Sequence, residues 1–149
     1  MSHDDEAGRI IRHLRLEQHP EGGWFRETLR DFGRDTRVDG ARAHSTAIYF
    51  LLRQGESSHW HRVDAVETWH FYRGAPLRLS IAEGNTAPVH HILGNDLEAA
   101  HHPQLVVPAG AWQAARTLGP YTLVGCTVAP GFEFSTFELA PPDFEPGRP

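Results

Sequence analysis

The sequence contains no lysine, and all fourteen of its basic residues are arginine. Without lysine, a chain cannot form a Schiff base on a lysine side chain and cannot build the lysine-containing phosphate loop of the Walker type. The chain has a single cysteine, Cys126, so no disulfide can form within it, which fits a reducing cytoplasm. We interpret Cys126, which lies in an apolar stretch, as inert packing.

Long apolar runs and an excess of positive charge are also missing. No window approaches the 18 consecutive apolar residues typical of a membrane span, and the acidic, polar start lacks the apolar core of a secretion signal. The formal net charge is −5, whereas nucleic-acid-binding domains usually carry a basic face. We therefore expect a cytoplasmic protein that has neither nucleic acid nor membrane as a partner.

The length of 149 residues suits one domain over residues 1–149, with a flexible N-terminus and a loose, proline-rich C-terminal tail. Apolar residues at helical spacing predict a helix over residues 6–16, which Asp4 or Asp5 can cap. Residues 31–44 are interpreted as a surface loop or polar hairpin with a turn at Asp39–Gly40, and residues 95–101 as one helical turn.

Most of the remaining chain is strand-like and is interrupted by glycine, proline and asparagine turn signals. Many short strands with frequent turns are typical of a sandwich or barrel. The expected strands are 24–30, 45–53, 58–63, 66–73, 77–83, 88–93, 104–107, 111–118, 121–129 and 133–138.

The candidate catalytic and metal-binding residues lie mainly in the stretch GESSHWHRVDAVETWHFYRG, residues 55–74. Alternation along a strand places His59 and His61 on one face and Trp60 on the other. Across the next turn, Glu67 shares a face with Trp69 and Phe71. If the two strands are neighbours in a barrel, His59, His61 and Glu67 converge inside, and two imidazoles with a carboxylate suit a divalent metal.

A fourth side chain for the expected site, beside His59, His61 and Glu67, comes from LVVPAGAWQAAR, residues 105–116. The turn at Pro108 and Gly110 sets the direction of the next strand, and Gln113 and Ala115 share a face of that strand. The small alanine leaves room for a ligand beside the Gln113 amide.

These motifs resemble those of the cupins. Gly55, the HxH pair, Glu67 and Gly74 resemble the first cupin motif, although the spacers around the HxH pair differ from the common pattern. Pro108 and Gly110 resemble the second motif, with Gln113 where a histidine is usual. The stretches that resemble the small single-domain family Cupin_5, over residues 9–140, are HPEGGWFRET, STAIYFLL, SHWHRVDAVETWHFYRG, VPAGAWQAAR and CTVAPGFEFSTFEL.

The resemblance implies an all-β fold, a double-stranded β-helix or jelly-roll barrel with an N-terminal helix outside it, and a homodimer. It implies two alternatives for the site. A divalent metal (iron, manganese, nickel or zinc) is held by His59, His61, Glu67 and Gln113, or the site acts without metal. Sugar-nucleotide epimerases of this fold illustrate the second case, with a histidine base and a tyrosine acid.

Our leading hypothesis is an isomerase or epimerase acting on a sugar or another small polar carbonyl compound. His61 or His59 is the base, Glu67 orients it, and a tyrosine such as Tyr49 returns the proton. Because residues alternate along a strand, only one of Arg26 and Glu27 faces inward. The expected substrate-binding residues are Trp24, Arg26, Trp69, Phe71 and Gln113. The alternatives are a metal-dependent oxygenase and a non-catalytic ligand-binding protein or sensor.

Overall fold

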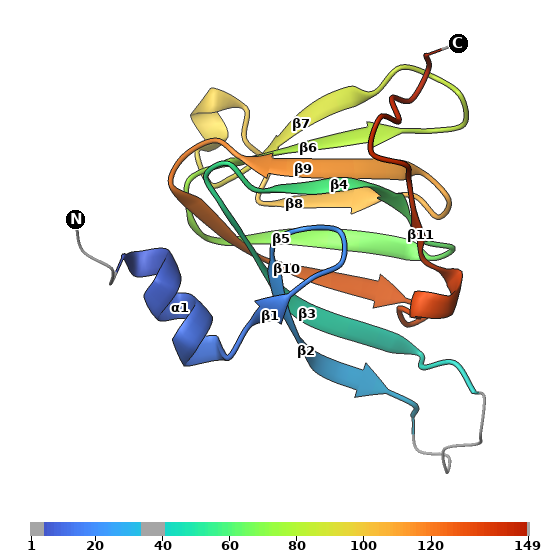
Figure 1. The fold of residues 1–149 in the computed structure, drawn as a ribbon, viewed down its shortest axis with the longest axis horizontal. Helices are drawn as coiled ribbons and strands as arrows, with labels where there is room; N and C mark the ends of the chain where they lie inside the picture. Colours follow the sequence, from blue (N-terminus) through green and yellow to red (C-terminus); the bar gives the residue numbers. More distant parts are fainter. Residues whose placement is uncertain (1–4, 34–40, 149) are drawn as a thin grey trace.

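The computed structural model describes residues 5–33 and 41–148, and most of the described chain forms antiparallel strands (Figure 1). The turn expected at Asp39–Gly40 lies outside these residues. The elements in chain order are α1 (Glu6–Leu14), β1 (Glu17–Gln18), β2 (Trp24–Asp31), β3 (Ser45–Arg53), β4 (Ser57–Arg62), β5 (Val66–Gly74), β6 (Leu77–Ala82), β7 (Val89–Leu93), η1 (Leu97–Ala99), β8 (Gln104–Val107), β9 (Trp112–Thr117), β10 (Tyr121–Ala129), η2 (Phe134–Thr136) and β11 (Glu138–Leu139).

The strands form two sheets that face each other. One has six strands in the order β1-β2-β3-β10-β5-β8, and the other has five in the order β11-β4-β9-β6-β7. Consecutive strands repeatedly cross from one sheet to the other, which produces the two stacked layers of a jelly-roll barrel (Figure 1). The expected all-β fold is therefore confirmed, and β2 to β10 lie within two residues of the expected ranges.

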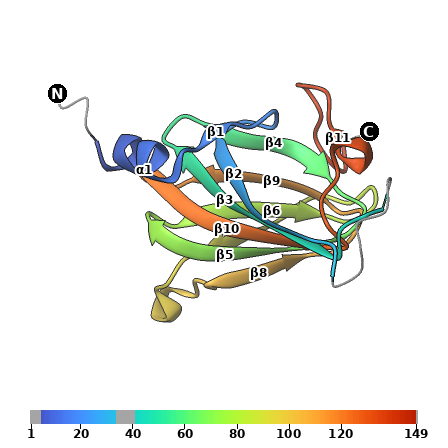
Figure 2. The ribbon, with the colours of Figure 1, turned by 90° about the horizontal axis from the view of Figure 1, so that it is seen from below.

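The helix α1 lies outside the barrel, at the end of the molecule away from β11 (Figure 2). The Asp5 carboxylate accepts a hydrogen bond from the Gly8 backbone N–H at 2.7 Å, which caps the first turn. Arg15, in the left-handed conformation, ends the helix two residues before the expected end. Its apolar face packs on a small cluster outside the barrel that includes Leu51, Tyr121 and Leu123.

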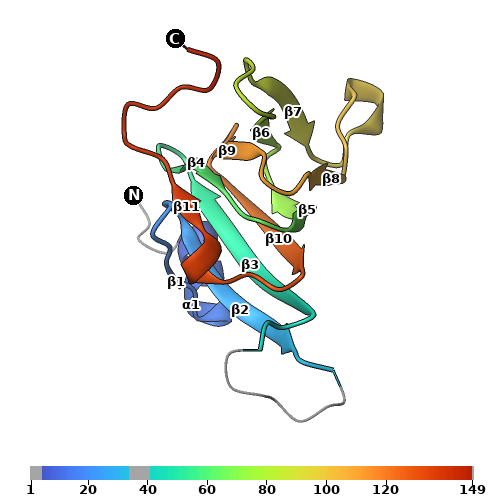
Figure 3. The ribbon, with the colours of Figure 1, turned by 90° about the vertical axis from the view of Figure 1, so that its right-hand side faces the viewer.

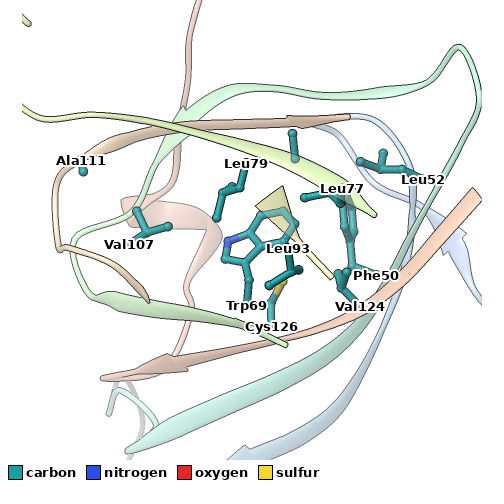
Figure 4. Close-up of a cluster of buried hydrophobic side chains, with 11 residues drawn as sticks. Phe50, Leu52, Trp69, Leu77, Leu79, Leu93, Val107, Ala111, Val124 and Cys126 are labelled. Atoms are coloured by element: carbon teal, nitrogen blue, oxygen red, sulfur yellow. The ribbon is translucent and has the colours of Figure 1, made fainter. Parts of the chain in front are cut away.

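The interior between the sheets is filled by apolar side chains around Trp69 (Figure 4). Trp69 is 1% exposed and meets the Phe50 ring edge-on, with 5.9 Å between centroids. Leu77 and Leu79 face this core from β6, so Arg78 and Ser80, which alternate with them, face the other way. The core lies beside the polar pocket described below and gives that pocket a rigid wall.

The chain after β10 differs from the expected strand at residues 133–138. It forms the short helix η2 and then β11, which pairs with β4 (Figure 3). The rings of Phe132, Phe134 and Phe137 pack on one another, with 4.9 to 6.0 Å between their centroids. Alternating aromatic residues predict a strand, but here all three gather in one cluster, which a straight strand does not allow.

The proline-rich tail, expected to be loose, also packs on the protein. The Phe144 ring lies 4.6 Å from the Trp112 ring between centroids, and Ala140 is buried beside it. None of the helices in the described residues has the length and apolar character that crossing a membrane requires.

We expect Leu79→Ala to lower the free energy of unfolding by about 3 kcal/mol, because Leu79 is fully buried and its removal leaves a cavity in the core. Urea denaturation measures the change. Leu97→Ala, at an exposed leucine of η1, is the control and should change stability by less than about 0.5 kcal/mol. Equal effects of the two substitutions would contradict this assignment of the core.

Candidate functional site

A pocket with mixed polar and apolar walls opens between the sheets beside the core. The space between its side chains measures about 510 Å³, part of it open to solvent. Its main ionisable or hydrogen-bonding groups are His19, Glu21, Thr46, His61, Glu67 and Cys126. Its apolar wall consists of Phe25, Ile48, Val63, Val128, Phe132 and Phe134.

A β-bulge in β4 decides which histidine enters the pocket. In the pairing of β4 with β9, Ser58 lies opposite Ala115, and His61 lies opposite Gln113. Between these pairs, β4 has one residue more than β9, which is a β-bulge. His61 points inward and is 2% exposed. His59 points outward, where its Nε2 lies 2.9 Å from the Pro141 carbonyl oxygen. The expectation that His59 and His61 share a face is therefore wrong, because simple alternation fails at a bulge.

A tight turn between β1 and β2 supplies a second acid that the sequence interpretation did not single out. Glu21 is 8% exposed, and its backbone carbonyl accepts a hydrogen bond from the His59 N–H at 2.8 Å. Gly22 follows with φ +106°, and a Cβ there would lie 2.0 Å from the Ser57 carbonyl oxygen. Only glycine lets the turn lie this close to β4. The HPEGG stretch therefore places Glu21 in the pocket.

Glu21 and His61 lie within hydrogen-bonding distance of each other in the pocket. Oε2 of Glu21 lies 3.0 Å from Nε2 of His61. The other ring nitrogen, Nδ1, lies 2.7 Å from the His59 carbonyl oxygen, which can only accept, so Nδ1 carries a hydrogen. Nε2 of a neutral His61 then accepts, and the proton between the two side chains comes from the Glu21 carboxyl. Transfer of that one proton interconverts a neutral pair and an ion pair.

Glu67 is held by a short chain of hydrogen bonds that ends in the core. Gln113 donates from Nε2 to Glu67 Oε1 at 2.9 Å, and Trp69 donates from Nε1 to Gln113 Oε1 at 2.8 Å. The indole N–H can only donate, so it fixes the orientation of the Gln113 amide. Gln113 is 0% exposed, so it positions Glu67 from behind rather than contacting a ligand.

Burial brings the acids of the pocket into the neutral range. It raises the pKa of Glu67 to about 7, with the charge of Glu21 adding to the rise and His61 opposing it. Burial also raises the pKa of Glu21 to about 8 and lowers the pKa of His61. At neutral pH, Glu21 therefore holds its proton and His61 is neutral, while Glu67 is close to half ionised. The three groups lie in one pocket, so they titrate as a coupled set.

Two further groups of the pocket, His19 and Cys126, are neutral near pH 7. Burial, followed by the charge of His61, lowers the pKa of His19 to about 4. Its Nδ1 accepts a hydrogen bond from the Glu21 N–H at 3.1 Å, and its ring packs against Phe25 at 4.5 Å between centroids. Burial raises the pKa of the Cys126 thiol well above its usual value, so it is not a thiolate.

Several expected substrate-binding residues lie away from the pocket. On β2 the inward residues are Phe25 and Glu27, so Arg26 is exposed, and Trp24 lies with the cluster beneath α1. Tyr49 lies against Tyr72 on the outer side of its sheet, whereas its neighbour Ile48 lines the pocket. The alternation along β2 and β3 was expected, but which face is inward depends on the packing of the sheets.

Trp69 and Phe71, also expected to bind substrate, belong to the core and its margin. Trp69 acts on the site only through Gln113. The pocket residues that the sequence interpretation missed are His19, Glu21 and the aromatic residues after β10. Cys126, interpreted as inert packing, also faces the pocket. The paired glycines after Glu21 were the available signal for a tight turn.

The expected metal ligands do not come together. Within residues 5–33 and 41–148, no group of three histidine, cysteine, aspartate or glutamate side chains is arranged to hold a metal ion. His59 lies outside the pocket, both ring nitrogens of His61 have partners, and the Gln113 oxygen is taken by Trp69. The side chains as placed do not fit the expected ligand set of His59, His61, Glu67 and Gln113.

We expect Gly22→Ala to destabilise the protein by about 2 kcal/mol more than Gly55→Ala. Both glycines have positive φ, so both substitutions strain the backbone, but a Cβ at Gly55 meets nothing within 4 Å. At Gly22 it also collides with β4 and displaces Glu21. Urea denaturation of the two variants measures the difference, and equal losses would show that the turn does not depend on the close approach.

We expect Glu21→Gln to stabilise the protein increasingly as the pH rises from about 5 to about 8. The folded-state pKa of Glu21, about 8, lies above its usual value, so the folded protein binds the proton more tightly than the unfolded chain. Stability contributed by this group is therefore present below its usual pKa and is lost as pH rises towards 8. Glutamine does not titrate and can still donate to His61 Nε2.

The measurement is the Tm of wild type and of Glu21→Gln at each pH in this range. The difference between the two Tm values removes the contributions of the other ionisable groups. Glu98→Gln, at an exposed carboxylate of η1, is the control, and its difference from wild type should stay flat. A flat difference for Glu21→Gln as well would mean that Glu21 is ionised in the folded protein.

Comparisons with known proteins agree with this fold. A protein from Shewanella oneidensis, solved by X-ray crystallography, is 40% identical, with a TM-score of 0.84 over 91% of this chain and 85% of that one. A hypothetical protein from Leishmania major is 30% identical, with a TM-score of 0.82 over 91% of this chain and 88% of that one.

A third structure, oxalate decarboxylase from Bacillus subtilis, is 13% identical, with a TM-score of 0.62 over 82% of this chain and 29% of that one. This likeness concerns the fold alone. No curated protein matches the sequence. The family model Cupin_5, described as cupin superfamily (DUF985), matches residues 8–140. Because that match spans most of the chain, the protein belongs to the Cupin_5 family of the cupin superfamily.

Proposed function

We propose that the barrel pocket catalyses proton transfer next to the carbonyl group of a small molecule, as an isomerase or epimerase. The observation that carries the proposal is the contact of 3.0 Å between Glu21 Oε2 and His61 Nε2, with a second buried acid, Glu67, in the same pocket. A general acid and a general base work best when their pKa values lie near the working pH.

The burial of the two acids assigns them different roles. Glu67, with a pKa raised to about 7, is the group that is partly ionised near neutral pH, so its carboxylate takes the proton from the carbon beside the carbonyl. The Glu21–His61 pair holds a proton at the same pH and returns it to that carbon or to its neighbour. Return to the opposite face of the same carbon is epimerisation. Return to the neighbouring carbonyl carbon, with transfer of the hydroxyl proton from one oxygen to the other, is isomerisation.

This scheme changes three of the roles expected from the sequence. The expected base was His61 or His59, whereas here His61 acts with Glu21 as the proton donor. Glu67 is the base rather than the group that orients it. No tyrosine among the described residues lines the pocket, so the Glu21–His61 pair takes the role expected for Tyr49. Gln113 remains in the site as a positioning residue, because its amide holds Glu67.

The apolar wall limits what can bind. Phe25, Phe132 and Phe134 contribute rings to the pocket, and flat aromatic faces suit the C–H faces of a sugar or of a similarly small carbonyl compound. A metal-dependent oxygenase needs three firm ligands, and one of those expected, His59, lies outside the pocket. The geometry therefore supports acid–base chemistry better than the oxygenase alternative.

The experiment is deuterium exchange. The protein in D₂O is offered a panel of aldoses, ketoses and sugar nucleotides, and loss of the C–H signal beside the carbonyl is followed by proton NMR. We expect exchange with wild type, and a loss of about 100-fold or more in Glu67→Gln and in His61→Asn, because each removes a proton-transfer group.

His59→Ala is the matched control, since it removes an imidazole that lies two residues from His61 on the same strand but points out of the pocket. We expect it to exchange within about twofold of wild type. Exchange that survives both pocket substitutions would contradict the proposal. A compound that binds tightly and is not exchanged would favour the non-catalytic alternative.

A further inference from the structure

A second hollow lies on the outer face of the five-stranded sheet, away from the barrel pocket. It is lined by side chains of β4, β6, β7 and β9, which are neighbours in that sheet (Figure 1), and encloses about 520 Å³, part of it open to solvent. Leu77 and Leu79 of β6 point into the core, so Arg78 and Ser80 point into this hollow from the opposite face.

The hollow contains two arginines that lie directly opposite each other. In the pairing of β6 with β9, Arg78 is the partner of Arg116. Like charges at directly opposite positions destabilise a sheet. Among the residues that the structure describes, no carboxylate forms an ion pair with either of them, although the chain as a whole carries a net charge of −5.

Two residues that line the hollow have a buried side-chain atom without a hydrogen-bond partner among the described residues. They are Ser58, at Oγ, and Arg78, at Nε. A buried polar atom without a partner costs free energy, so such atoms are rare in folded proteins.

A serine and a histidine lie beside the arginines. Ser80 Oγ and His90 Nδ1 share a hydrogen bond at 2.6 Å, which fixes the orientation of the imidazole. The pKa of His90 is lowered by burial and then by the positive charges of Arg78, His91 and Arg116. The hollow is therefore a place of positive potential.

From this geometry we propose that the outer hollow binds a phosphate-type dianion, either inorganic phosphate or a phosphate monoester. The two arginines, at paired positions of adjacent strands, offer several N–H donors to the oxygens of one anion, whose negative charge neutralises both of theirs. Trp60 lines the same hollow and can contact the organic group of an ester. This site is separate from the acid–base pocket and does not depend on its proposed function.

The experiment is isothermal titration calorimetry of the full chain at constant ionic strength, with inorganic phosphate in one series and phenyl phosphate in another. We expect saturable one-to-one binding by wild type and at least about tenfold weaker binding by Arg78→Gln and by Arg116→Gln. Tighter binding of phenyl phosphate would identify the monoester as the better ligand, and equal binding would identify the anion alone. Circular dichroism and Tm show whether each variant is folded.

Two control variants test whether phosphate binding is confined to the outer hollow. Arg73→Gln removes an exposed arginine of the other sheet, and His61→Asn alters the barrel pocket; both should bind phosphate as wild type does. Absence of saturable binding, or equal weakening by Arg73→Gln, would overturn the proposal. The proposal would also be overturned if wild type formed a dimer that phosphate does not affect and that Arg116→Gln dissociates. The arginines would then face a second copy of the chain.

Discussion

The buried contact between Glu21 and His61 is the interaction on which the site depends. Neither side chain can be buried alone without a large desolvation cost, and a shared proton lets both remain neutral inside the barrel. The contact requires two departures from regular structure, the bulge that turns His61 inward and the glycine turn that brings Glu21 against β4. Each departure places one half of the pair, so the contact needs both.

The hydrogen-bonded chain from Trp69 through Gln113 to Glu67 connects this site to the packed core. Trp69 is rigid because it lies among fully buried aliphatic side chains (Figure 4). Its indole N–H fixes one end of the Gln113 amide, so the other end always presents a donor to Glu67. The packing of Trp69 therefore holds the Glu67 carboxylate in a fixed position through Gln113. Acid–base chemistry needs this kind of preorganisation.

The two faces of the five-stranded sheet carry different chemistry for one geometric reason. Side chains alternate along β6 and β9, so the inward set joins the core and the barrel pocket while the outward set brings Arg78 and Arg116 together. Acids with raised pKa values collect inside, where burial disfavours ionisation, and permanent positive charge collects outside. The two proposed sites therefore share the sheet but not their electrostatics.

The all-β barrel, the limits of most strands and the family resemblance could be predicted from the sequence, because they follow from local alternation, turn residues and motifs along the chain. The sequence also identified His61, Glu67 and Gln113 as neighbours. The outward positions of His59 and Arg26 and the inward position of Glu21 depend instead on how the strands and turns pack together. A bulge reverses the alternation, the inward face of a strand is set by its packing, and a turn residue has no periodicity, so none of these positions can be obtained from spacing.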